Sequence, residues 1–332
     1  ILQRSDQSST NQFMPKQGFL STVHEVKENM DDELDLYNLT ANIAVGDSAD
    51  LVLTASLFER DLYREFAAEP IERFAFGNLS GFSCARRAGL SFPAQRCNSE
   101  QMAAHVEALG LFMPSSGEQP MQMKMVSYEA RLSSNWDSRW NYTVGVFYQT
   151  RDFDLTSNIP GHDANGYITV PPHYAFRALT FEDREQLSFF GEASYDLTDQ
   201  LTLTGGLRRF DIDRNNGGVT EVGFRPFNVP SGPVPAGVTK EGGTLYKVHI
   251  GYQISDDVLV YGQSAEGFRS GGINRLLNPA IPPEYKSDSL VNYELGAKTT
   301  WLDNSLLFNA SYSHIIWDDI QSAADDPDAP VS

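Results

Sequence analysis

The sequence lacks any run of about twenty apolar residues, the length that a helix needs to cross a bilayer. A transmembrane helix is therefore excluded, and only a β-barrel, which pairs its backbone polar groups between strands, would carry this chain through a membrane. Basic residues are also scarce, with 25 Lys and Arg against 44 Asp and Glu and a formal net charge of -19. Because phosphate binding needs clustered Lys and Arg, no nucleic acid is expected as a partner. We expect solvated acidic loops and turns, with attraction of cations as the alternative.

A catalytic constellation is missing as well. The 6 histidines are scattered, no nucleophile elbow surrounds a serine, and no Gly-rich loop precedes a helix. We therefore expect no enzyme activity, no catalytic or metal-ligating residues, and no cofactor.

Cysteine is limited to Cys84 and Cys97, which lie in a stretch rich in Gly, Ser and Arg. We expect a disulfide between them, formed in an oxidising compartment, because a metal site would need further Cys or His nearby. Reactive thiols are the alternative.

The clearest pattern in the sequence is a strict alternation of apolar and polar residues over 184–214. This two-residue period is that of a β-strand with one apolar and one polar face. A short link at 196–200 separates two such strands of about ten residues each, which predicts a long hairpin of the kind found in membrane-spanning barrels. The apolar face consists of Leu187, Phe189, Gly191, Ala193 and Tyr195 in the first strand and Leu201, Leu203, Gly205 and Leu207 in the second.

Four further stretches repeat this design, so the sequence predicts an all-β, transmembrane antiparallel β-barrel portion of about ten strands. The predicted hairpins cover 33–62, 125–152, 184–214, 242–268 and 290–316. Short links alternate with long loops, as in outer-membrane barrels with short periplasmic turns and long extracellular loops. We therefore assign the links at 46–50, 136–140, 196–200, 254–258 and 301–305 to the periplasmic side. The aromatics expected to form interfacial girdles are Trp136, Trp140, Tyr195, Tyr252, Trp301 and Trp317.

The remaining segments lack this alternation. Residues 1–32 are predicted to be a polar arm or loop, 63–124 a long external loop, and 317–332 the start of a further external loop. Within the long loop a helix is expected from Ser99, with Gly110 as its stop. A group of methionines follows, for which packing is the expected role and metal binding the alternative: Met113, Met121, Met123 and Met125.

Five short phrases, in order, resemble the barrel of TonB-dependent outer-membrane receptors. They are FGEASYDLTD with LTLTGGLR (190–199 and 201–208), VY (260–261), EGFRSGGIN (266–274), NYELGAK (292–298) and IWDDIQ (316–321). Each phrase alone is weak, but their order and spacing are specific, and the resemblance covers roughly residues 31–321.

The resemblance implies active import of a scarce, bulky small-molecule ligand, such as a ferric siderophore or another metal chelate, into the periplasm. The external site would be made by loops and plug, the barrel would contact outer-membrane lipid, and the TonB complex would supply energy through the plug. Such barrels have about 22 strands around the plug. The chain starts without an initiator Met or signal peptide and contains neither plug nor terminal strands, so we expect a segment truncated at both ends.

Two other functional classes remain open at this point. One is a passive porin-like outer-membrane barrel, in which the loops set selectivity and no energy is coupled. The other is a soluble all-β binding or adhesion module, which the alternating aromatic and aliphatic faces disfavour.

Candidate site residues come from the polar strand faces and one external strand end. Arg269, followed by Ser270 and two glycines, is a candidate ligand contact, with loop shaping as the alternative for the glycines. The other candidates are contacts to the plug across the lumen, with generic lumen polarity as the alternative: Arg131, Glu192, Arg208, Lys247, Glu294 and Lys298.

Overall fold

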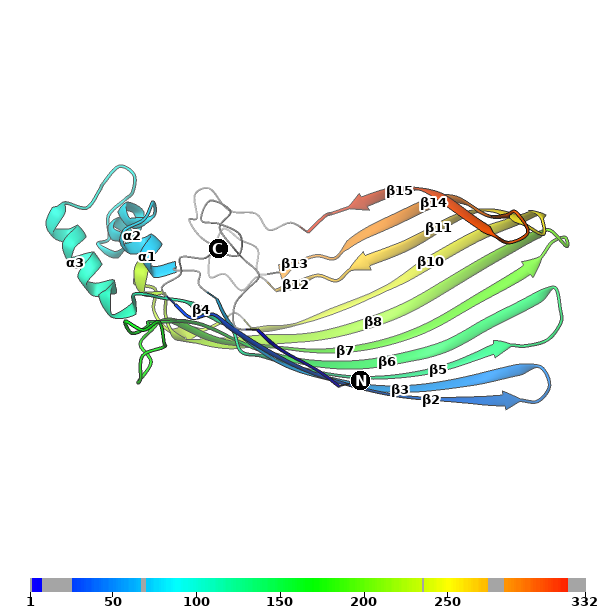
Figure 1. Ribbon diagram of the computed structural model, residues 1–332, viewed down its shortest axis with the longest axis horizontal. Coiled ribbons are helices and arrows are strands. Elements are labelled where there is room, and N and C mark those ends of the chain that lie inside the picture. Colours follow the sequence, from blue (N-terminus) through cyan, green and yellow to red (C-terminus); the bar gives the residue numbers. More distant parts are fainter. Residues whose placement is uncertain (1, 8–25, 67–69, 235, 274–283, 322–332) are drawn as a thin grey trace.

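A computed structural model describes residues 2–7, 26–66, 70–234, 236–273 and 284–321 (Figure 1). Strands dominate these residues and a small group of helices lies between β3 and β4. The strands are β1 (Leu2–Gln7), β2 (Asn29–Val45), β3 (Ala49–Phe66), β4 (Gly117–Glu118), β5 (Met121–Ser134), β6 (Trp140–Pro160), β7 (Tyr174–Asp196), β8 (Leu201–Val222), β9 (Gly232–Pro233), β10 (Gly237–Ser255), β11 (Val258–Arg269), β12 (Gly272–Ile273), β13 (Glu284–Tyr285), β14 (Asp288–Trp301) and β15 (Leu306–Asp318). The helices are α1 (Pro70–Ala75), α2 (Ser80–Arg87), α3 (Ser99–Leu109), and the short 3-10 helices η2 (Gly110–Phe112) and η3 (Arg225–Phe227).

One antiparallel sheet contains 13 of these strands, and β12 and β13 form a separate pair. Consecutive long strands are neighbours throughout, as expected when each hairpin pairs with the next. The all-β, antiparallel prediction is confirmed. Figure 1 shows a curved wall whose short turns lie at one end, here called the turn end, while α1, α2 and α3 gather at the other, the loop end. In the described part of the chain, no helix is long and apolar enough to cross a bilayer.

The long strands have two distinct faces. On β7 the outward side chains of Leu187 and Phe189 are 38% and 56% exposed, whereas those of Gln186 and Ser188 are 8% and 0% exposed. We call the first the outer face and the second the inner face. Apolar outer-face residues continue from Leu187 to the turn end, forming an apolar band whose height suits the hydrocarbon core of a membrane.

Beyond the apolar band the strands continue with polar residues on both faces. On β7 the outer face changes to Glu185 and Asp183, and on β8 it changes to Arg209 and Asp211. The alternation that identified the hairpins stops there, but backbone pairing does not. The paired segments therefore run to 160, 174 and 222, beyond the predicted hairpin bounds at 152, 184 and 214.

Two predicted loops need correction. Residues 2–7, assigned to a polar arm, form β1 by pairing with β2 above the apolar band, where a strand needs no apolar face. The 63–124 loop contains two more helices than predicted, α1 and α2, besides the expected α3. The rest of the arm, except for 26–32, and the tail from 322 onward lie outside the described residues.

Candidate functional site

All seven charged candidates lie on the inner face. Residues opposite each other in neighbouring strands share a face, and the register connects Arg131 through Gly145 and Phe190 to Arg208. The next inner row on β7 contains Glu192, which faces Lys247 across Gly206. The same alternation places Arg269, Glu294 and Lys298 on this face.

Four of these residues come together around one groove. Lys247 Nζ donates to Glu192 Oε2 at 2.9 Å, reaching across the bare Gly206. Arg208 Nη2 donates to Ser188 Oγ at 3.1 Å. Together with Arg131, these charged side chains line a groove of about 520 Å³ whose floor includes aromatic rings. The groove offers both signs of charge to whatever lies in the lumen.

Glu294 and Lys298 form a separate cluster around Tyr261. The Tyr261 hydroxyl donates to Glu294 Oε1 at 2.5 Å, and Lys298 Nζ lies 5.8 Å from the centre of the tyrosine ring. The ring lies across Gly296, where an added Cβ would come within 2.4 Å of it. Glu294 and Lys298 are on β14, two strands away from Lys247 on β10.

The structure does not bring Arg269 to either cluster. Its Nε donates to Asp288 Oδ2 at 3.0 Å, and one of its terminal nitrogens donates to the backbone oxygen of Gln321 at 2.9 Å. These bonds tie β11 to β14 and to the residues after β15. Gly271 follows closely, and a Cβ there would lie 2.4 Å from the backbone oxygen of Tyr285. The contacts support loop shaping at this position.

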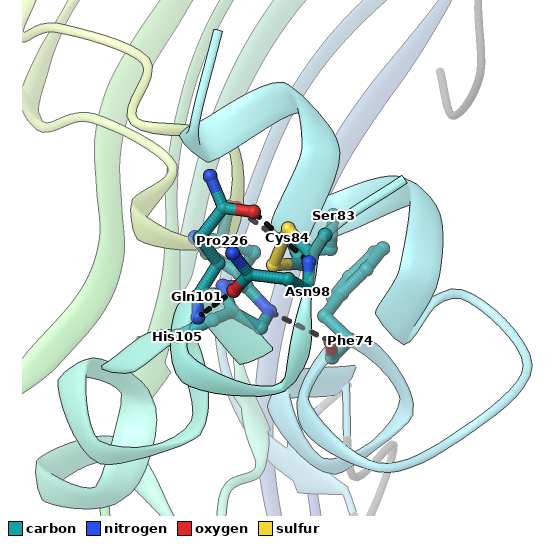
Figure 2. The surroundings of a disulfide bond; sticks show 8 residues. Phe74, Ser83, Cys84, Asn98, Gln101, His105 and Pro226 are labelled. Carbon is teal, nitrogen blue, oxygen red and sulfur yellow. Dashed lines mark hydrogen bonds between the residues drawn. A yellow bond between two sulfur atoms is a disulfide. The ribbon is translucent and has the colours of Figure 1, made fainter. Parts of the chain in front are cut away.

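The helices at the loop end form a lobe, residues 70–113, held by a disulfide (Figure 2). Cys84 of α2 is bonded to Cys97, which precedes α3, across a sequence separation of 13 residues. The Asn98 side chain accepts a hydrogen bond from the Gln101 backbone at 2.8 Å, while the Gln101 side chain accepts from the Asn98 backbone at 2.9 Å. This reciprocal cap starts α3 directly after the disulfide.

The lobe is anchored to the sheet by apolar and polar contacts. Phe74 of α1 packs edge-on against Phe224 and Phe227, with ring centres 5.2 Å apart in both pairs. Ser83 Oγ donates to the backbone oxygen of Pro226 at 2.9 Å. The segment between β8 and β10 therefore fixes the lobe, although it is far away in the sequence.

One titratable group of the lobe and one in the turn after β6 have altered pKa values. Burial lowers the pKa of His105, whose Nε2 lies 3.0 Å from the Phe74 carbonyl oxygen. The pKa of Asp163, in the turn after β6, is lowered because its carboxylate accepts backbone hydrogen bonds from Tyr167 and Asn165. Neither group belongs to a metal cluster: within the described residues, no set of three or more His, Cys, Asp or Glu is arranged to hold a metal ion.

The four methionines lie in two places. Met113 packs against the apolar core of the lobe, while Met121, Met123 and Met125 lie on the inner face of β5. These positions support the packing role.

A family model described as TonB dependent receptor-like, beta-barrel, matches residues 23–332. The chain belongs to this family.

Receptors from Yersinia and E. coli are similar to this chain. The pesticin receptors of Yersinia enterocolitica and Yersinia pestis are 23% and 26% identical to this chain over 193 residues, which is 55% of the chain and 28% of each relative. The ferric yersiniabactin uptake receptor FyuA from Yersinia pestis has a similar fold, with a TM-score of 0.64 at 15% identity over 89% of this chain and 37% of FyuA. The ferric-catecholate import receptor Fiu from E. coli K12 gives a TM-score of 0.57 at 13% identity, over 86% of this chain and 41% of Fiu. The chain thus spans well under half the length of these relatives.

Sequence reasoning missed one group of charged residues in this TonB-dependent receptor barrel. Arg151, Arg184 and Arg214 lie side by side on the inner face, in one row across β6, β7 and β8. Two of them served only as the ends of the predicted 184–214 hairpin. Predicting this row requires the register of three neighbouring strands, and the alternation of apolar and polar residues does not determine that register.

Proposed function

We propose that this chain is part of the barrel of an outer-membrane receptor that binds a scarce, bulky ligand, such as a ferric siderophore, and imports it into the periplasm. The observation that carries the proposal is the family match over 23–332, on a wall with an apolar outer band and a charged inner face. The short turns would then face the periplasm and the lobe the exterior. The names of FyuA and Fiu motivate the choice of ligand class.

The charged residues of the inner face would serve this function as contacts to a plug. Arg131, Glu192, Arg208 and Lys247 line one groove and would pair with plug side chains, as Glu294 and Lys298 would further along the wall. Arg269 would instead hold the external ends of β11 and β14 together. Energy would come from the TonB complex acting on the plug.

Uptake measurements on the full-length receptor test this proposal. A strain lacking the gene is complemented with it and given radiolabelled ferric chelates, including ferric yersiniabactin, under iron limitation. We expect uptake that needs the gene and stops when TonB is deleted or the proton-motive force is dissipated. Uptake that needs the gene but continues without TonB would instead establish the alternative, a passive porin-like barrel.

A further inference from the structure

The row of three arginines on the inner face is electrostatically unusual. Arg151 lies directly opposite Arg184, which lies directly opposite Arg214. Like charges at opposed positions of neighbouring strands destabilise a sheet. The cost is raised by burial, because the side chains of Arg151 and Arg214 are only 27% and 10% exposed. This concentration of positive charge occurs in a chain with a net charge of -19.

The described residues neutralise this row only in part. Glu182 is ion-paired with Arg151 and lies 3.7 Å from Arg214 Nε, so one carboxylate serves two cations. The middle arginine, Arg184, donates to Gln186 at 2.9 Å and to Gln149 at 3.4 Å, which are neutral amides. Among the described residues, no carboxylate lies within ion-pair distance of Arg184. The row therefore has more positive than negative charge.

The arginines are also held in place. Both terminal nitrogens of Arg214 donate to the segment after β11, one to the Gly271 carbonyl and one to Ser270 Oγ at 2.7 Å. Arg151 is held by Glu182. The Nε atoms of all three arginines are buried without a hydrogen-bond partner in the described structure. A fixed, incompletely neutralised group of guanidinium ions is a preorganised anion site.

Apolar side chains flank this row. Met125 and Phe58 continue the row beyond Arg151. Two inner rows nearer the turn end on β8, Phe210 stacks on Phe268 at 3.9 Å between ring centres. The row lies three residues beyond Leu187, at the loop-end rim of the apolar band. An organic anion would meet both its charge partners and apolar surface here.

We propose that Arg184, supported by Arg151 and Arg214, forms a subsite for the carboxylate or a similar anionic oxygen group of a small organic ligand. The proposal deepens the import function, on which its biological meaning rests, by assigning the ligand an exposed negative group. The same chemistry has a second source, a carboxylate of the protein itself from outside the described residues. The test below separates the two sources.

The test uses full-length receptor purified in detergent and citrate as the probe. Calorimetric titrations at constant ionic strength, balanced with sodium chloride, compare the wild type with Arg184→Gln. We expect citrate to bind the wild type and to bind Arg184→Gln about tenfold more weakly or worse, because a hydrogen-bonded charge is lost. Arg184→Lys keeps the positive charge but loses the planar guanidinium with its paired N–H donors. Its affinity for citrate should lie between those of the wild type and Arg184→Gln. Arg209→Gln, on the outer face of the neighbouring strand β8 and paired with Asp211, is the matched control and should bind as the wild type does.

Thermal unfolding without citrate identifies the source of the anion. If no protein carboxylate occupies the site, Arg184→Gln removes an uncompensated cation. The variant then unfolds at the same temperature as the wild type or at a higher one. A lower unfolding temperature, with no citrate binding to the wild type, means that a protein carboxylate already fills the site and overturns the proposal. Equal citrate affinity in the wild type and Arg184→Gln overturns it too. Citrate binding that depends on Arg184, in a receptor that fails the uptake test, would remove the import function and leave the subsite standing.

Discussion

At the scale of single residues, His105 shows how one polar group in the lobe limits the conditions under which the lobe is stable. Its Nε2 must carry a proton to donate to the Phe74 carbonyl oxygen, and its Nδ1 is buried without a partner in the described structure. A second proton on Nδ1 would therefore find no acceptor there, and Arg87 nearby repels the positive ring. The neutral imidazole is the form that fits.

This arrangement predicts an acid-sensitive lobe. Burial lowers the pKa of His105 below its ordinary 6.5, so the unfolded chain binds the extra proton more readily than the folded lobe does. Stability is fully present above about pH 6.5 and is lost as the pH falls toward the lowered folded pKa. Hydrogen exchange of peptides from α1 and α3, corrected for intrinsic rates, should accelerate between pH 7.5 and pH 5.

The control is His105→Gln, whose amide donates a hydrogen bond but does not titrate in this range. Its exchange should be faster than that of the wild type at pH 7.5, yet nearly independent of pH. An equal acid response in both proteins would assign the effect to other groups of the lobe.

Residue roles were only partly predictable from the sequence. Placing Glu192 and Lys247 on the wet face needed only the two-residue period, but their ion pair depends on the register between β7, β8 and β10. The hydrogen bonds that Arg269 donates to Asp288 and Gln321 depend on how the strand ends meet after folding. Alternation specifies a face, whereas pairing partners are set by contacts between distant segments.

At the scale of elements, the same substitution should change stability differently on the two faces of a strand. Leu203 of β8 lies on the outer face within the apolar band and is 41% exposed, while its neighbour Thr204 lies on the inner face. In a membrane barrel the first would meet lipid and the second the polar lumen. Arginine is therefore a sensitive probe of this assignment.

We predict that Leu203→Arg, opposite Tyr195 near the turn-end rim of the apolar band, destabilises the folded receptor by about 1 kcal/mol, as charged residues do on the lipid face of such barrels near the interface. Thr204→Arg, one residue away in the same strand, should cost much less because the lumen is polar. Denaturant unfolding in lipid vesicles measures both values. Similar losses for the two variants would contradict the assignment of faces and support a soluble sheet with two wet surfaces.

The lobe offers a second prediction at this scale. The disulfide closes a short loop with a sequence separation of 13 residues, and the chain-entropy relation gives it about 3 kcal/mol of stabilisation. Replacing Cys84 and Cys97 together by Ser should therefore open the lobe without unfolding the wall, whose strands pair independently of it. Limited proteolysis on intact cells should cut within 70–113 much faster than in the wild type.

The wall supplies the control for this experiment. The double variant should still migrate as a folded barrel in unheated electrophoresis samples. Unchanged proteolysis would show that the Phe74, Phe224 and Phe227 contacts suffice, and loss of the barrel would show that the lobe is needed for assembly.

The elements that could be predicted are those that a local sequence pattern specifies by itself. The hairpins follow from the apolar band, and α3 was expected from Ser99 on. Gly110, expected to stop this helix, is instead right-handed and begins the 3-10 helix η2. Helices α1 and α2, of 6 and 8 residues, are too short to be stable alone and depend on packing against η3. Likewise, β1 and the loop-end extensions of β6, β7 and β8 have no apolar face, so the pattern contains no signal for them.

At the scale of the whole molecule, the described wall is open. Among the described residues, β15 pairs with β14 alone, and every residue of β15 is exposed. Unpaired backbone groups cost several kcal/mol each in lipid, and an open edge in water invites aggregation. An open wall therefore conflicts with the membrane position that its apolar band requires.

We accordingly predict that another strand covers β15 in the full-length receptor. The loop-end residues 314–318 of β15 lie beyond most of the apolar band, where water reaches the backbone and lipid does not mask exchange. Their amides should exchange as slowly as those of 289–293 of β14, to which they pair on one side. Exchange that is orders of magnitude faster in 314–318 would mean that the edge stays open, and a closed barrel would then be ruled out together with the import function that depends on it.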